Sequence, residues 1–386
     1  MLIPLKYNTR YLVTRWKSTL TTAVTFGLVV ATFIIVMSLS QGIERALNTS
    51  GNPLNVIIMR AAAQAEGQSE LTLDQYQIVR NLPGIARGLD GDPLAAPEIL
   101  TLVNKPRNNG KTSNLQVRGV HPNAFLLRPA VQIVEGRMMR PGLREMVVAK
   151  SVAGRFRGFR LGDTPRLGRG QFTVVGVFDA QGTAFDSEIW ADCKEVMQEF
   201  DRMNYSTVVV RAADRAAVGR IQDAVDRDRR LKLMAVDEEK YYLDQTRTSK
   251  PIKAFAMFLA FTMAVGACFA GMNTMYANVA GRVKEIGTLR ILGFTPAAVM
   301  TSFLIESVCL ALLGGALGCA LSLPINGLAT GTTNFNSFSE IVFYFTITPG
   351  LMLRGMVFAA FMGLAGGLPP AWSASRQPVL AALRQV

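Results

Sequence analysis

Four long apolar stretches, nearly free of charged residues, constrain the fold of this chain more than any other feature. They are Thr19–Gln41, Ala254–Val279, Val299–Leu323 and Pro349–Trp372. A helix needs about 20 residues to cross the roughly 30 Å hydrocarbon core of a membrane, and each stretch reaches that length. We therefore predict four transmembrane helices, of which the last three follow one another closely.

The segment between the first and second stretches has mixed polarity and is long enough to bury its own core. Runs rich in β-branched residues predict strands at Leu54–Met59, Glu145–Ala149, Phe172–Phe178 and Ser206–Arg211. Helical patterns follow the first and last of these at Leu73–Leu82 and Arg215–Arg229. We predict a mixed α/β domain here, and a helix over Val236–Lys250 that continues into the second transmembrane helix.

Basic residues close to the helix ends set the orientation, because Lys and Arg are enriched on the cytoplasmic side. They are Lys6, Arg10, Arg15, Lys17, Arg282, Lys284, Arg290, Arg376 and Arg384. The loop Ile325–Thr348 has no Lys or Arg and one acid, Glu340, as expected of an outward-facing loop. The large domain then lies outside as well. The first helix could be a cleaved signal peptide, but its apolar run is too long, and we expect an uncleaved anchor.

These predictions divide the chain into consecutive segments. They are a cytoplasmic amino-terminal segment (1–18), transmembrane helix 1 (19–41), a periplasmic α/β domain (42–250), transmembrane helix 2 (251–279), a cytoplasmic coupling helix (280–298), transmembrane helix 3 (299–323), a short periplasmic loop (324–348), transmembrane helix 4 (349–372) and a cytoplasmic tail (373–386).

Catalytic and metal-binding patterns are weak. His121 is the only histidine, so a zinc site or a histidine-based triad has little support. Gly110-Lys111-Thr112 resembles the end of a phosphate-binding loop, but Lys105 stands where that motif requires glycine. We predict that the chain binds no metal and is not an enzyme.

Charge is also spread too evenly to indicate nucleic-acid binding, despite a net charge of +13. The acidic clusters Asp223/Asp226/Asp228 and Asp237/Glu238/Glu239 alternate with basic residues, and we interpret them as solvated helix faces. We predict no nucleic-acid partner.

Within the predicted spans, Glu306 is the ionisable residue that most needs an explanation, and its distance from Pro296 places it near the cytoplasmic boundary. Two G-x-x-x-G patterns indicate either close helix packing or glycines that are simply tolerated in apolar helices. They are Gly314 with Gly318 and Gly363 with Gly367.

A charged cassette, Gly281–Pro296, separates the second and third apolar stretches. Gly293 suits the left-handed residue that ends a helix, Thr295 suits an N-cap and Pro296 suits the first turn of the next helix. Ile286 and Leu289 form an apolar ridge with Gly293, and the charges are scattered around the rest of the circumference. This pattern predicts a short helix seated in a groove of a protein partner.

The cassette resembles the signature of the FtsX/MacB family of ABC permeases. The resembling run is Arg282-x-Lys-Glu-Ile-Gly-Thr-Leu-Arg-x-Leu-Gly-Phe-Thr, followed by an apolar helix bearing Glu306, and the tail Ser375–Arg384 is also similar. Gln377 departs from the family, which often has an acid there. The order of one span, a large outer domain and three spans matches as well.

The resemblance implies a non-catalytic permease subunit of a bacterial inner-membrane export or efflux complex. It implies two copies of a cytoplasmic ABC ATPase that holds ATP and Mg, a second permease copy, membrane lipid and a periplasmic adaptor. ATP-driven motion would be transmitted to the periplasmic domain. The residues it assigns to ATPase coupling are Arg282, Lys284, Glu285, Ile286, Gly287, Leu289, Arg290 and Gly293. Those it assigns to a tail contact are Arg376, Pro378, Leu383 and Arg384.

An alternative is a membrane-tethered sensor with an outer ligand-binding domain. A sensor normally carries a cytoplasmic output domain, whereas the predicted cytoplasmic segments are short. The transported substrate cannot be inferred from these patterns.

Overall fold

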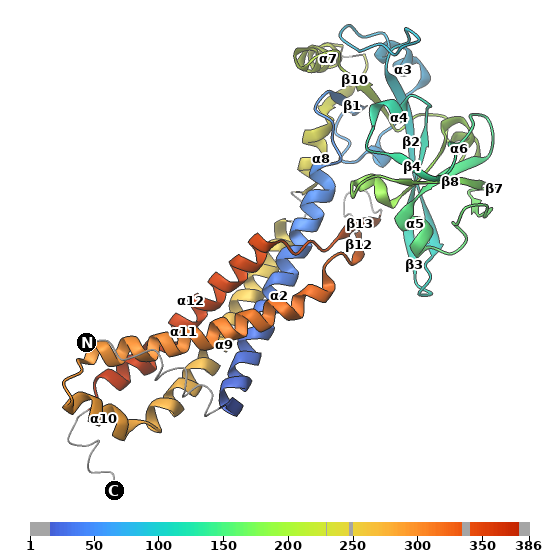
Figure 1. Cartoon of the computed structure of the whole chain (residues 1–386). Coiled ribbons are helices and arrows are strands. Elements are labelled where there is room, and N and C mark those ends of the chain that lie inside the picture. Colours follow the sequence, from blue (N-terminus) through green and yellow to red (C-terminus); the bar gives the residue numbers. More distant parts are fainter. Residues whose placement is uncertain (1–15, 229, 247–249, 334–339, 378–386) are drawn as a thin grey trace. The chain divides into compact units, whose positions relative to one another are not determined.

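The computed structural model describes residues 16–228, 230–246, 250–333 and 340–377. They belong to two compact units (Figure 1). The membrane unit holds the described residues of Met1–Gln41, Pro251–Leu328 and Phe345–Val386. The outer domain holds those of Gly42–Lys250 and Ala329–Tyr344.

The regular elements of the membrane unit are helices throughout its described residues. Its helices are α2 (Trp16–Asn48, whose last residues belong to the outer domain), α9 (Lys250–Ala280), α10 (Val283–Ile291), α11 (Pro296–Ser322), the short η4 (Leu323–Ile325) and α12 (Pro349–Ser375). Four of these, α2, α9, α11 and α12, are long and apolar enough to cross a membrane. Together with the α/β domain between the first two, they confirm the predicted fold class.

Two apolar clusters hold the membrane unit together. In the larger one, α2 supplies Phe26, Val30 and Ile34 against Ala311 and Met362 of α11 and α12. The second cluster joins the end of α9, α10, the start of α11 and the end of α12. The short helix α10 is therefore packed against the other helices through the second cluster.

The outer domain is built on one nine-stranded sheet with the order β11-β1-β10-β2-β3-β9-β5-β8-β4. Its strands are β1 (Asn55–Arg60), β2 (Ala95–Pro106), β3 (Thr112–Val120), β4 (Gln132–Gly136), β5 (Glu145–Ala149), β8 (Thr173–Asp179), β9 (Glu188–Asp192), β10 (Thr207–Arg211) and β11 (Leu233–Asp237). The pairs β3–β9 and β5–β8 are parallel and the others antiparallel. The short strands β6 (Arg166–Leu167) and β7 (Gly170–Gln171) pair with each other.

Short helices surround this sheet. They are η1 (Glu66–Gln68), α3 (Leu73–Val79), α4 (Ala124–Leu127), α5 (Lys150–Arg155), η2 (Ala184–Ser187), α6 (Cys193–Glu199), α7 (Arg215–Arg227) and α8 (Glu238–Thr246).

Strand β2 connects two halves of the outer domain. Its first residues, Ala95–Glu98, pair with β10, and Ile99–Pro106 pair with β3. On the β10 side, α3 and α7 cover one apolar core. On the β3 side, a second core surrounds the fully buried Trp190, which contacts Phe178 and Phe185. The network described below lies near β2 and so borders both halves.

The four predicted strands are confirmed within a residue or so at each end, and helices follow the first and last of them. The prediction for Val236–Lys250 is wrong at its start. Val236 pairs with Ile57 in the sheet, and α8 begins only at Glu238. Residues 236 and 237 are extended because they pair with β1. The predicted continuation of the helix into the second span passes through residues 247–249, which lie outside the described residues.

The predicted short loop between the last two spans contains a β-hairpin. Its strands are β12 (Ala329–Thr333) and β13 (Glu340–Tyr344), which pair from Ala329 and Tyr344 to Thr333 and Glu340. The hairpin belongs to the outer domain rather than to the membrane unit.

Candidate functional site

The cassette forms the helix α10, and its backbone ends as its sequence predicts. Gly293 has φ +93°, its N–H donates to Arg290 O (3.2 Å), and Phe294 N–H donates to Leu289 O (3.1 Å). These two bonds are those of a Schellman motif, which uses a left-handed glycine to satisfy the last carbonyls of a helix. Thr295 Oγ1 then accepts from Ala298 N (3.2 Å), so that α11 begins at Pro296. The turn between the helices is therefore locally determined.

Arg282 anchors the start of α10 in the membrane unit. Its Nη1 donates to Glu306 Oε2 (2.9 Å) and its Nη2 donates to Glu306 Oε1 (3.1 Å), which is a bidentate pair. Both residues are buried, and the guanidinium lies over the ring of Phe303. The sequence pattern predicted charges scattered around the helix, away from the apolar ridge, but Arg282 lies buried against the membrane unit. Arg282 is therefore the partner that Glu306, a charge inside a span, requires.

The apolar ridge of α10 also turns inward. Ile286 is buried in the second apolar cluster with Met275, Val299 and Phe303, and Gly287 is buried beside it. The expectation that Ile286 packs into a groove of another protein does not fit this burial, because its own membrane unit already covers it. Leu289 is half-buried.

The opposite face of α10 is exposed. Its exposed residues are Lys284, Glu285, Thr288, Ile291 and Leu292, whose spacing places them on one side of the helix. Ile291 and Leu292 are 58% and 71% exposed, although neither was selected from the sequence. Arg290 is half-buried at the edge of this face. The charges are therefore sorted: Arg282 faces inward and Lys284 and Glu285 face outward.

The four glycines of the G-x-x-x-G patterns lie at helix contacts. A Cβ at Gly314 would lie 2.7 Å from Ala23 O, and one at Gly318 would lie 2.6 Å from Gly27 O, both on α2. On α12, added Cβ atoms at Gly363 and Gly367 would meet α11 at distances of 2.7 and 2.5 Å. Any larger side chain at these positions would force the helices apart.

Of the predicted tail contact, only Arg376 is described. It caps α12, and its guanidinium lies over the ring of Trp372 at 4.3 Å. Pro378, Leu383 and Arg384 lie outside the described residues.

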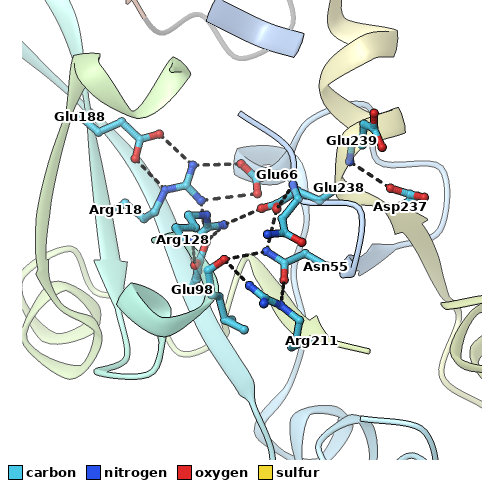
Figure 2. A network of polar contacts seen from close by, with 12 residues as sticks. Asn55, Glu66, Glu98, Arg118, Arg128, Glu188, Arg211, Asp237, Glu238 and Glu239 are labelled. Atoms are coloured by element: carbon cyan, nitrogen blue, oxygen red, sulfur yellow. Dashed lines mark hydrogen bonds and ion pairs between the residues drawn. The ribbon is translucent and has the colours of Figure 1, made fainter. Parts of the chain in front are cut away.

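A second concentration of charge lies inside the outer domain (Figure 2). Arg118 pairs with Glu66, Glu98 and Glu188, and Arg128 pairs with Glu98 and Glu238. All six side chains are buried. The network therefore holds four carboxylates to two guanidiniums.

Glu238 joins the two ends of the domain that lead to membrane helices. It is the first residue of α8, and its Oε2 accepts from Asn52 N (3.0 Å) and Asn55 Nδ2 (2.8 Å), just after α2 (Figure 2). The interpretation of the Asp237–Glu239 cluster as a solvated face is wrong for Glu238, which is fully buried. Its partners are distant in sequence, so the local pattern carries no sign of them.

Burial affects the network's acids unequally. It raises the pKa of Glu66 above the ordinary value, against the attraction of Arg118 and Arg128, and that of Glu238, against the attraction of Arg128. Burial also acts to raise the pKa of Glu98, but Arg128 and Arg118 outweigh it and leave that pKa lowered. Of Glu66, Glu98 and Glu238, it is Glu98 whose charged form the arginines favour.

Two family models match this chain. The MacB-like periplasmic core domain matches residues 18–228, and the FtsX-like permease C-terminal part matches residues 257–379.

Individual curated relatives share about a quarter of their aligned residues with this chain. The macrolide export ATP-binding/permease protein MacB of Bdellovibrio bacteriovorus is 24% identical over 377 residues, covering 89% of this chain and 55% of that protein. The protein of the same name from Agrobacterium fabrum is 25% identical over 380 residues, covering 92% and 56%. The chain thus spans about half the length of these curated relatives. The match to the solved periplasmic region of MacB from Actinobacillus actinomycetemcomitans covers 52% of this chain and 96% of that one, with 13% identity and a TM-score of 0.39.

The family model of the MacB-like periplasmic core domain alone matches more than half of the residues of this chain. The chain therefore belongs to the family of permeases that carry a MacB-like periplasmic core domain.

Proposed function

We propose that the chain is the permease subunit of an ABC export or efflux complex of the bacterial inner membrane. A cytoplasmic ABC ATPase, present in two copies and carrying ATP and Mg, would bind under α10, and its motion would be transmitted to the outer domain in the periplasm. A second permease copy, membrane lipid and a periplasmic adaptor would complete the complex. The relatives' names, which join ATP binding to a permease and specify macrolide export, support this class of function.

The two-faced character of α10 is the observation that carries the proposal. Its inner face is fixed to the membrane unit through Arg282 and Ile286, and its outer face presents Lys284, Glu285 and Leu292. A helix fixed on one side and exposed on the other can pass a push from a partner to the helices that hold it. We propose the outward residues Lys284 and Glu285, together with the exposed Ile291 and Leu292, for direct ATPase contact.

Charge reversal on the outer face tests the proposal. We expect Glu285→Lys to lose most of the co-purifying ATPase, or to leave it bound with ATP hydrolysis uncoupled from the outer domain, while membrane insertion is unchanged. Glu135→Lys makes the same chemical change on an exposed strand residue of the outer domain and serves as the control.

The measurement is recovery of a P-loop ATPase, in stoichiometric amount, with the tagged full chain purified in mild detergent from its native cells. Repeated absence of such an ATPase from the wild-type preparation would contradict the proposal. Equal recovery and equal coupling with Glu285→Lys and wild type would remove α10 as the contact.

A further inference from the structure

The β12–β13 hairpin connects α11 and α12 and yet packs in the outer domain. Val342 and Phe343 of β13 are buried. A Cβ at Gly42, just beyond the membrane part of α2, would lie only 2.6 Å from Tyr344 O, so the strand also lies close against the outer end of that helix. The hairpin is thus an integral part of the outer domain's packing.

Glu340 is the polar anchor of this hairpin. Its Oε1 accepts a hydrogen bond from Arg155, and its Oε2 accepts from Arg107 and from Ser113 Oγ, the last at 2.6 Å. The carboxylate is buried, with both oxygens occupied by charged donors. It is also the single acid of a segment in which the sequence has no basic residue. We call Glu340, Arg107, Arg155 and Ser113 the hairpin seat.

The seat is prepared by elements far away in sequence. Arg107 follows β2, Ser113 lies in β3 and Arg155 ends α5. Asn108 N donates to Arg155 O (2.8 Å), so the backbone itself brings the two arginines together. On the hairpin side, a Cβ at Gly331 would lie 2.0 Å from Glu340 Oε1, so this position of β12 admits only glycine while Glu340 is seated.

The connections from the hairpin to the membrane helices are short. Six residues separate Ser322 at the end of α11 from Ala329, and four separate Tyr344 from Pro349 at the start of α12. In these connections Gly327 N donates to Phe345 O (2.8 Å) and Phe345 N donates to Leu328 O (3.1 Å). Paired backbone of this length leaves little slack, since even a fully extended chain spans at most about 3.5 Å per residue.

We propose that the hairpin seat is a third mechanical connection between the membrane helices and the outer domain, besides the chain connections through α2 and α8. Glu340 is its positioning residue: when α11 and α12 move, the seated hairpin moves the β2–β3 and α5 region with them. This inference rests on the proposed function, because it concerns motion that originates at an ATPase.

The test uses the full chain with its partner ATPase in lipid nanodiscs, and deuterium uptake as the readout. The change is Glu340→Gln, which keeps the shape and removes the charge. We expect faster exchange at Val342 and Phe343 without nucleotide, by about tenfold or more, because the half-buried guanidiniums of Arg107 and Arg155 lose their charged acceptor. We also expect the change in outer-domain exchange caused by ATP and vanadate to shrink severalfold, with ATP hydrolysis retained.

Two further variants separate the seat from a general loss of structure. The triple variant Arg107→Glu/Arg155→Glu/Glu340→Arg reverses every charge, and we expect it to recover part of both readouts. Glu145→Gln removes a carboxylate bound to Arg137 elsewhere in the outer domain and should leave both at the wild-type level.

Two results with Glu340→Gln would overturn this inference alone. In one, β13 exchanges faster but ATP and vanadate still change outer-domain exchange as much as in the wild type. In the other, the exchange of β13 is unchanged. Absence of any nucleotide-dependent change in the wild-type outer domain would overturn the proposed function and this inference with it.

Discussion

Buried ion pairs occur in both units of this protein, and they differ in charge balance. In the membrane unit, one guanidinium meets one carboxylate, Arg282 with Glu306, and both oxygens are paired. In the outer domain, Arg118 and Arg128 serve four carboxylates. A balanced pair can hold one geometry with both groups charged, whereas an unbalanced network favours proton uptake by some of its acids. The first is suited to fixing a helix, and the second couples packing to pH.

Removing the shared guanidinium of the network should have the largest effect. Arg118→Leu leaves Glu66, Glu98 and Glu188 buried without their common partner. One broken buried pair costs about 3–5 kcal/mol, and here three pairs share the lost group. We expect the outer domain to fail to fold or to be rapidly digested by protease in the full chain. A protease-resistant domain in Arg118→Leu would show that the carboxylates can all be accommodated by protonation.

Breaking the balanced pair should come next. Arg282→Ala leaves a single unpaired carboxylate at Glu306, and we expect a loss of about 3–5 kcal/mol from the membrane unit. The measurement is unfolding of the full chain in mixed micelles, with exchange followed in α10 and α11. The swapped pair Arg282→Glu/Glu306→Arg should recover part of the loss. Arg354→Ala removes an exposed arginine from α12 and is the matched control; an equal loss in that variant would mean that pairing is not the cause.

The unbalanced network should also make the stability of the outer domain depend on pH, with a smaller effect than the loss of an ion pair. Because the folded pKa of Glu66 is raised above 4.5, the folded state binds more protons than the unfolded state between 4.5 and that pKa. Stability therefore falls as pH rises through this window, by up to about 1.4 kcal/mol per pH unit for each such acid. We expect Glu66→Gln to flatten the slope and, in infrared spectra of the full chain recorded within this pH window, to remove one protonated-carboxyl band.

Glu98 should give a dependence of stability on pH of the opposite sign. Its folded pKa is lowered, so its contribution to stability is present above 4.5 and is lost as pH falls through the folded pKa. Glu98→Gln should therefore remove a slope below 4.5. Because the charge of Glu98 helps to raise the pKa of Glu66, the infrared band of Glu66 should persist but titrate at lower pH. Loss of the same band in both variants would mean that the network titrates as one unit.

Local signals in the sequence predicted the parts of the fold that depend on neighbouring residues. Gly293 and Thr295 act through bonds a few residues away, and both occupy the predicted positions. Apolar length predicted the four long helices. The strand Glu145–Ala149 was also predicted at its observed bounds, since its β-branched run faces a core.

Burial of charge was not predictable in the same way. Glu238 and Glu340 look like surface acids in their local sequence, and their arginine partners lie far away along the chain. The burial of Arg282 was not predicted, because a helical wheel gives the angles of the side chains but not which side the membrane unit covers. Glu306, an acid in an apolar helix, was the one available signal that a nearby cation had to turn inward.

An exposed pair gives the smallest expected effect and isolates burial as the variable. Arg169 Nη2 and Asp201 Oδ2 lie 3.1 Å apart, the same distance as Arg282 Nη2 and Glu306 Oε1, but both side chains of the first pair are over 70% exposed. Asp201→Asn keeps a residue that tolerates the local φ of +56°. We expect a change of about 0.2–1 kcal/mol at most, because water screens the charges, and its disappearance in about 1 M salt. A loss as large as that of Arg282→Ala, measured by the same unfolding assay, would mean that distance rather than burial sets the strength of these pairs.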